Sequence, residues 1–215
     1  MPEQTTQPAL NRFARRRAVT RQALIGAARR ILAERGTGDV SIQEIADRAD
    51  VGFGSFYNHF SSKAELFSAA VGEALEDYGH ELDAVAGGLG DPAEKFAASV
   101  RLTMAMVQSR PELMRVLRNS GLDHVHSGRG LGPRALRDIE EGVAAGRFTV
   151  DDPVVALSAA SGALLGLVDL RLREPAGAAP GDGERMAELV LRMLGVPVAE
   201  AREIATRPLA SPARG

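Results

Sequence analysis

The chain has 215 residues, of which 45% are hydrophobic and 25% are charged, and its formal net charge is −2. These values are typical of a soluble globular chain of one or two domains, and no apolar run reaches the roughly 20 residues of a membrane span. Without cysteine there can be no disulfide and no thiolate metal site, and the arginine-rich N-terminus lacks the apolar core of a secretion signal, so we expect a cytoplasmic protein with no membrane contact.

Positive charge is concentrated at the N-terminal end. Residues 1–63 contain ten arginines or lysines and six acids, a net charge of +4, so the remainder carries −6. The densest run, Arg12–Arg21, is either a solvated disordered tail or an arm that reaches phosphates or the minor groove of DNA. We assign residues 1–19 to a flexible basic arm, and we expect the protein to touch nucleic acid at one end only.

Three helices are predicted next. The first runs over residues 20–35, with Thr20 as its cap and an apolar stripe along one side. Ser41 and Glu44 form a capping box, which marks the start of the second helix. A tight turn at residues 49–52 separates the second helix from a third, expected at residues 53–60. A short helix, a tight turn and another short helix form a helix-turn-helix, the unit that enters the major groove of DNA.

The third helix has an apolar side and a polar side. Phe56 and Phe60 are spaced i, i+4 and are expected to pack inward. Ser55, Tyr57, Asn58 and His59 then point largely outward. Phe53, in the first turn, either presses on a thymine methyl or covers the turn.

The motif Ile-Ala-x-x-Ala-x-Val-x-x-x-Ser-Phe-Tyr-x-His-Phe-x-x-Lys-x-x-Leu resembles the DNA-binding signature of the TetR family of transcriptional regulators, a resemblance that covers roughly Thr20 to Leu66. Where that family usually has Gly before the turn Val, this chain has Asp50, which can still adopt a left-handed conformation. The resemblance implies an all-α protein. Residues 20–66 would form its three-helix DNA-binding domain, and residues 67–206 a larger helical effector-binding and dimerisation domain, with a disordered tail at 207–215.

Eight residues are expected to contact double-stranded DNA. The hydroxyl of Tyr57 is expected to meet a phosphate, because Phe56 and Phe60 occupy the inward face. Lys63, at the start of the next helix, corresponds to a phosphate contact in the family. The full set is Ser41, Phe53, Gly54, Ser55, Tyr57, Asn58, His59 and Lys63.

Helices continue through the rest of the chain, and there is no strand alternation and no repeat. A capping box of Ser62 and Glu65 opens a long helix, and Asp91 followed by Pro92 is a strong helix start. Residues 175–183 form a connection rich in glycine and proline. The predicted helices span residues 62–85, 92–110, 111–119, 133–146, 153–173, 183–194 and 198–206.

The helices at 153–173 and 183–194 are expected to form a homodimer interface. Small residues recur every four positions at Ser158, Gly162 and Gly166, so another helix can approach closely. The alternative is that both helices pack inside one subunit. A four-helix interface suits proteins of this kind, which read paired half-sites. The predicted interface consists of Ser158, Gly162, Leu165, Gly166, Met186, Leu189, Val190 and Met193.

The middle of the chain carries weaker signals. Met104, Met106 and Met114 fall on helices that surround an effector pocket in the TetR family, and methionine adapts to irregular apolar cavities. They are either pocket residues or ordinary core. His80, His124 and His126 lack a strong third donor nearby, so we expect no metal site, and no cofactor is expected.

The chain shows no phosphate loop, no Gly-x-Ser-x-Gly and no His-Glu-x-x-His, so an enzyme is not expected. The resemblance to the TetR family favours a ligand-responsive repressor that binds a palindromic operator as a dimer and is released by a small, apolar effector. One alternative is a DNA-binding regulator of the same fold that has no small-molecule ligand or acts as an activator. Another is a helical enzyme or carrier whose N-terminal resemblance is vestigial.

Overall fold

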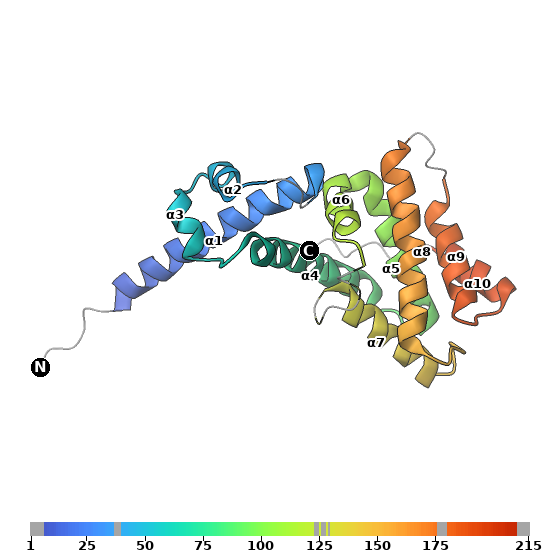
Figure 1. Ribbon diagram of the computed structural model, residues 1–215. Coiled ribbons are helices and arrows are strands. Elements are labelled where there is room, and N and C mark those ends of the chain that lie inside the picture. The colour runs from blue at the N-terminus through green and yellow to red at the C-terminus, as the bar shows by residue number, and fades with distance from the viewer. Residues whose placement is uncertain are drawn as a thin grey trace, which may run out of the picture. The chain divides into compact units, whose positions relative to one another are not determined.

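The computed structural model describes residues 7–36, 40–122, 125, 128, 130–175 and 180–209. All regular secondary structure in these residues is helical and comprises ten helices, in agreement with the predicted all-α class (Figure 1). The chain divides into two compact units, Met1–Val71 and Gly72–Gly215.

The first unit contains α1 (Gln7–Arg35), α2 (Ile42–Arg48), α3 (Phe53–Tyr57) and the first turns of α4 (Lys63–Ala86). Phe56 and Phe60, which the spacing directed inward, are buried in its core, and so is Phe67 of α4. They pack among the apolar residues of α1 and α2, which include Leu24, Ile31 and Ile45.

The start of α1 corrects the predicted flexible arm. Residues 7–19 continue α1, while residues 1–6 of the predicted arm lie outside the described residues. Thr20 does not cap a helix. Its hydroxyl donates instead to the carbonyl of Arg16 at 3.1 Å, the back-bond that threonine makes inside a helix. Between Ala9 and Ile25 there is no proline or glycine to end the helix.

The helix-turn-helix forms where its capping pattern placed it. Ser41 is the N-cap of α2, and its Oγ accepts the amide N–H of Glu44 at 3.0 Å. Asp50 has a φ of 54°, so the expected left-handed turn residue is confirmed. The third helix is shorter than predicted, because it ends at Tyr57 with Asn58 as its C-cap. The chain must turn there to place Ser62, whose Oγ accepts the amide of Glu65 at 3.2 Å and caps α4.

The second unit is built around α5 (Pro92–Ser109), which packs against α6 (Pro111–Asn119), α7 (Leu131–Ala144), α8 (Pro153–Arg173), α9 (Asp182–Met193) and α10 (Val198–Thr206). Asp91 and Asp152 cap α5 and α8 as their sequence patterns predict. The helix α7 begins two residues before Pro133, because Gly130, with a φ of 81°, turns the chain directly into it.

Two details correct the predicted C-terminal boundary. Arg207, the first residue of the predicted disordered tail, forms ion pairs with Glu94 and Glu203. Pro208 and Leu209 lie beside α5 at a small hollow. Residues 210–215 of that tail fall outside the described residues.

Candidate DNA-binding and effector sites

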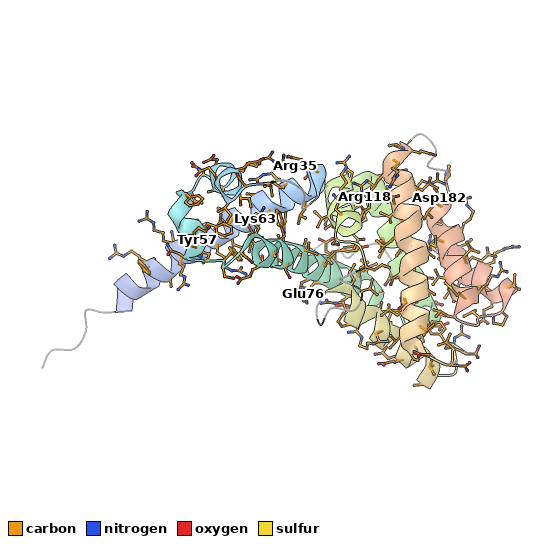
Figure 2. The ribbon with its side chains drawn as sticks, in the orientation of Figure 1. Arg35, Tyr57, Lys63, Glu76, Arg118 and Asp182 are labelled. Atoms are coloured by element: carbon orange, nitrogen blue, oxygen red, sulfur yellow. The ribbon has the colours of Figure 1, made fainter. Side chains whose placement is uncertain are left out.

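The outward face of α3 is aromatic as well as polar. Phe53 is 46% exposed, and Tyr57, which is labelled in Figure 2, is 55% exposed. The two rings meet edge to face with their centroids 5.8 Å apart. Gly54 and Asn58 are exposed, and Ser55 and His59 are half-buried. The helix therefore offers apolar ring edges with a hydroxyl, an amide and an imidazole beside them.

Ser41 and Lys63, the two predicted DNA contacts outside α3, each hold a structural hydrogen bond. Lys63 Nζ donates to the carbonyl of Val40 at 2.7 Å and ties the start of α4 to the chain before α2 (Figure 2). An ammonium has three donors, so two remain for a phosphate. Ser41 uses a lone pair of its Oγ as the α2 cap, and its hydroxyl proton can still be donated.

Two arginines of α1 lie at the end of α3, a proximity that sequence patterns alone had not indicated. Arg17 Nη2 donates to the carbonyl of Asn58 at 3.3 Å, and the Arg21 guanidinium lies 5.4 Å from the centre of the Phe60 ring. Partial burial lowers the pKa of His59, and the charges of Arg17 and Arg21 lower it further. The imidazole is therefore held in its neutral form near pH 7.

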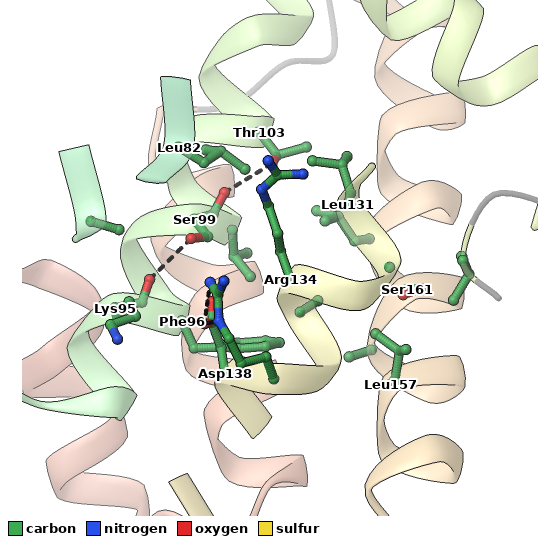
Figure 3. Close-up of a pocket in the computed structure, with 18 of the residues that line it drawn as sticks. Leu82, Lys95, Phe96, Ser99, Thr103, Leu131, Arg134, Asp138, Leu157 and Ser161 are labelled. Carbon is green, nitrogen blue, oxygen red and sulfur yellow. Dashed lines mark hydrogen bonds and ion pairs between the residues drawn. The ribbon is translucent and has the colours of Figure 1, made fainter. Parts of the chain in front are cut away.

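The second unit encloses a cavity of about 150 Å³ between the end of α4 and helices α5 to α8 (Figure 3). Most of its wall is apolar, formed by side chains that include Leu82, Phe96, Val100, Leu131, Leu157 and Leu164. The wall also carries charged groups, which distinguishes it from an ordinary packing defect.

The charged part of the cavity comes mainly from α7. Asp138 is buried and accepts from Arg137 Nη2 at 3.0 Å. Burial raises the pKa of Asp138, although Arg137 and Lys95 oppose the shift. A carboxylate held in such a place is a strong hydrogen-bond acceptor for a ligand hydroxyl, since water does not compete for it.

Hydroxyl groups of α5 line the same cavity. Ser99 Oγ donates to the carbonyl of Lys95 at 3.1 Å, and Thr103 Oγ1 donates to the carbonyl of Ser99 at 2.8 Å (Figure 3). The buried Tyr78 hydroxyl lies 2.7 Å from Thr103 Oγ1, and burial raises the pKa of Tyr78. The phenol therefore stays neutral.

Arg134 connects the cavity wall to α4. Its Nη2 lies 2.7 Å from Glu76 Oε1 and its Nε lies 2.9 Å from Asp83 Oδ2, so one guanidinium joins two carboxylates that are two turns apart on α4. Hydrogen bonds from Arg134 and from the Gly130 amide lower the pKa of Glu76 to about 2. We call Glu76, Gly79, Asp83 and Arg134 the Arg134 clamp.

The methionines predicted to line an effector pocket do not line this cavity. Met114 is completely buried, Met104 is buried on the side of α5 that faces Gly183 of α9, and Met106 is half-buried elsewhere on α5. Sequence reasoning missed Arg134 and Asp138, because the charge pattern of α7 is also typical of a solvated helix face. Charged side chains recur at i, i+3 and i+4 between the apolar residues of α7.

Of the residues predicted to form the dimer face, six are exposed or half-buried in the single chain and two are buried. On α8, Gly162 and Gly166 are exposed, and a Cβ added to either would meet nothing within 4 Å. Leu189 and Met193 of α9 are 55% and 43% exposed. Ser158 and Leu165 are half-buried.

Met186 and Val190 correct the prediction, because they are buried within their own chain, at 8% and 1% exposure. The side of α9 that carries Ala187, Val190 and Leu191 packs against the core of the second unit.

By length and composition α8 is long and apolar enough to cross a membrane, and few of its residues are buried in the single chain. Over the described residues, no group of three or more His, Asp or Glu side chains is arranged to hold a metal. His124 and His126 lie outside the residues that the structure describes.

Comparison with protein families gives two matches that together span most of the chain. Residues 24–70 match the family described as "Bacterial regulatory proteins, tetR family". Residues 91–207 match "Tetracyclin repressor-like, C-terminal domain".

Among solved structures, the chain is similar to RolR. It is 38% identical to RolR without ligand, with a TM-score of 0.69 over 86% of this chain and 96% of that one. It is 36% identical to RolR in complex with resorcinol, with a TM-score of 0.66 over 93% of this chain and 100% of that one.

Among curated proteins, the chain is 32% identical over 92 residues to the HTH-type transcriptional regulator BetI of Brucella anthropi, a match that covers 43% of this chain and 47% of that protein. The chain thus spans about half the length of the curated relatives that it matches.

Proposed function

Because the chain belongs to the TetR family of transcriptional regulators, we propose that it is a ligand-responsive repressor. It binds a palindromic operator as a homodimer in the cytoplasm, and a small molecule in the second unit releases it from DNA. The observation that carries the proposal is the cavity of about 150 Å³, because Arg134 in its wall forms a hydrogen-bonded ion pair with Glu76 of α4.

The exposed face of α3 supports DNA binding. A helix of five residues offers few side chains to the major groove, and here they include the exposed rings of Phe53 and Tyr57. We infer that Phe53 contacts a thymine methyl, while the hydroxyl of Tyr57 and the free donors of Lys63 contact phosphates. Ser41, Gly54, Ser55, Asn58 and His59 complete the proposed DNA face.

The uncovered apolar helix α8 supports a dimer. An apolar helix of which only a few residues are buried in the single chain needs a partner. Gly162 and Gly166 leave room on α8 for the backbone of a second helix, and Leu189 and Met193 of α9 extend the apolar face. A second copy of the chain satisfies this surface and also supplies the second recognition helix that a palindrome requires.

The dimensions and chemistry of the cavity suggest the class of effector. A cavity of the same volume, about 150 Å³, in another protein accommodates benzene, so the space suits one aromatic ring. Asp138 can accept a hydrogen bond from a ring hydroxyl, and Arg134 can donate one to it. The complex of RolR with resorcinol agrees with this chemistry. We therefore propose a hydroxylated single-ring compound, which is more polar than the apolar effector expected from the sequence.

The Arg134 clamp supplies a route from the effector to α4. Arg134 and Asp83 line the cavity and are bonded to each other, so a ligand hydroxyl that binds either one competes with their ion pair. The helix α4 is one continuous element that begins in the first unit and ends in the second. We infer that the intact clamp holds α4 in the conformation that binds DNA, and that the effector loosens it.

The test uses DNA selected from a random library by the purified protein, with resorcinol as the probe. Resorcinol should bind, should lower the affinity for the selected DNA, and should itself bind more weakly by the same factor when that DNA is present. Failure to select any DNA would contradict the regulator itself. Selection of DNA without binding of resorcinol or other dihydroxybenzenes would contradict the effector class. If resorcinol binds and leaves the DNA affinity unchanged, the clamp mechanism is wrong. The protein would then be a DNA-binding regulator that this ligand does not release from DNA.

A further inference from the structure

The N-terminal turns of α1 extend beyond the core of the first unit. The buried residues of α1 begin at Leu24, whereas every residue from Arg12 to Val19 is exposed. Figure 1 shows this part of α1 continuing past α2 and α3 toward the N-terminus. We call residues 12–19 the basic extension. At about 1.5 Å per residue these eight residues add some 12 Å of helix.

The charge of the basic extension is of one sign. It contains four arginines, and α1 has no acidic residue before Glu34. The side chains of Arg12, Arg15 and Arg16 form no ion pair or hydrogen bond within the described part of the chain. Arg12 and Arg16 are spaced i, i+4, as are Arg17 and Arg21, and like charges at that spacing repel each other.

This arrangement is unfavourable for a helix in isolation. A helical segment without a buried face gains little from packing, and short isolated helices are marginal in water. The like charges of the extension add to that cost. A polyanion bound along the segment would neutralise this repulsion, so the charge pattern indicates a polyanionic partner.

The position of the extension beside α3 indicates that the polyanion is DNA. At its base, Arg17 is bonded to the carbonyl of Asn58, and Arg21 lies over the ring of Phe60, both directly after α3. The extension therefore leaves the domain beside the helix proposed to enter the major groove. Arg12, Arg15 and Arg16 follow the i, i+3, i+4 pattern of a single helix face, so one phosphate backbone can contact all three.

We propose that the basic extension is a second DNA-contacting surface, on which Arg12, Arg15 and Arg16 bind backbone phosphates outside the bases that α3 reads. The proposal rests on the proposed DNA binding by α3 and adds to it a site that reads no sequence. It explains why α1 continues as a helix past the last residue that the core requires.

The test compares the full-length wild type with the triple variant Arg12→Gln, Arg15→Gln, Arg16→Gln on the selected DNA and on random DNA. Each phosphate contact contributes about 0.9 to the slope of log affinity against log salt, so the slope should fall by about 2.7 per subunit. Affinity should fall equally for both DNAs, because phosphate contacts carry no base information. Hydroxyl-radical footprints should lose protection only in the flanks.

The matched control removes the same charge from the exposed residues Arg110, Arg185 and Arg202 of the second unit, again by change to Gln. This variant should keep the wild-type slope and footprint. Because the three arginines of the extension are exposed, the test variant should unfold at the wild-type temperature, and circular dichroism checks this.

Three outcomes would overturn the proposal. One is a triple variant with the slope and footprint of the wild type. Another is a wild type that selects no DNA, which would also overturn the proposed function. The third is wild-type binding to phosphatidylglycerol vesicles that the triple variant loses while its DNA binding is unchanged, which would assign the extension to an anionic membrane surface.

Discussion

The guanidinium of Arg134 lies directly against the backbone of Gly79. A Cβ at residue 79 would stand 2.7 Å from both Cζ and Nη1 of Arg134, which is closer than atoms pack. Glycine in a helix interior costs about 0.5–1 kcal/mol relative to alanine. At this position the missing side chain leaves space on α4 for the guanidinium, which can then reach both Glu76 and Asp83.

Gly79→Ala should therefore displace Arg134 and weaken both ion pairs. We expect the variant to bind operator more weakly without effector and to respond less to resorcinol. Its thermal stability should not rise, because the lost contacts offset the gain in helix propensity. Fluorescence anisotropy with labelled operator measures the DNA affinity, and calorimetry measures the unfolding temperature.

Gly72→Ala is the matched control on the same helix. A Cβ at residue 72 would meet nothing within 4 Å, so alanine should stabilise α4 by about 0.5–1 kcal/mol. That corresponds to a rise of about 1–4 °C in unfolding temperature for a chain of this size. If Gly79→Ala behaved like Gly72→Ala in stability and in effector response, the clamp would have no role in coupling.

Asp138→Asn tests the charged wall of the cavity. A group whose folded-state pKa is raised keeps its proton to higher pH in the folded state, so its contribution to stability falls as pH rises through that pKa. Replacing the carboxyl group should therefore raise the free energy of unfolding relative to the wild type, and this gain should grow as pH rises from 4 to 7. Urea unfolding of wild type and variant at several pH values measures this difference.

The same variant should bind resorcinol about 10-fold or more weakly at pH 7, since a hydrogen bond to a charged group is worth about 1.5–3 kcal/mol. Asp151→Asn, at an exposed position before α8, is the control and should leave both properties unchanged. Unaltered resorcinol affinity in Asp138→Asn would remove Asp138 from the site.

His59 should make operator binding depend on pH. Its pKa is lowered in the free protein by burial and by Arg17 and Arg21, and nearby phosphates would raise it. DNA binding then takes up a proton, so operator affinity should increase as pH falls from 7.5 to 5.5. His59→Gln should flatten this dependence in anisotropy titrations. A variant with the wild-type pH profile would show that another group is responsible.

Local signals explain which parts of the fold the sequence could predict. Ser41, Asp91 and Asp152 cap helices through hydrogen bonds to residues two or three positions away, so their pattern suffices. Thr20 has the same residue type as a cap but lies inside α1, bonded back to Arg16. Its role depends on whether the preceding residues are helical, and a capping pattern alone does not determine that.

The candidate sites also differ in whether local sequence or long-range packing determines them. The exposed and buried residues of α3 could be read from their spacing, because Phe56 and Phe60 fix the inward face. The effector cavity could not be predicted, because side chains of five helices, α4 to α8, line it together, and that depends on long-range packing. Val190 illustrates the limit at the dimer face. An apolar stripe on α9 shows that the face is buried but does not show whether the same chain buries it.

Gly162→Leu tests the dimer. Within one chain the site is open, since a Cβ there meets nothing within 4 Å, so the variant should fold normally. In a close crossing of two α8 helices an isobutyl group has no room, and overpacking costs about 1–3 kcal/mol per copy. Sedimentation should therefore show monomer, and operator affinity should fall because two half-sites are no longer held together. Gly88→Leu, at another open site outside α8, should remain a dimer. If Gly162→Leu sedimented as a dimer of normal stability, the helices would have to associate through another face.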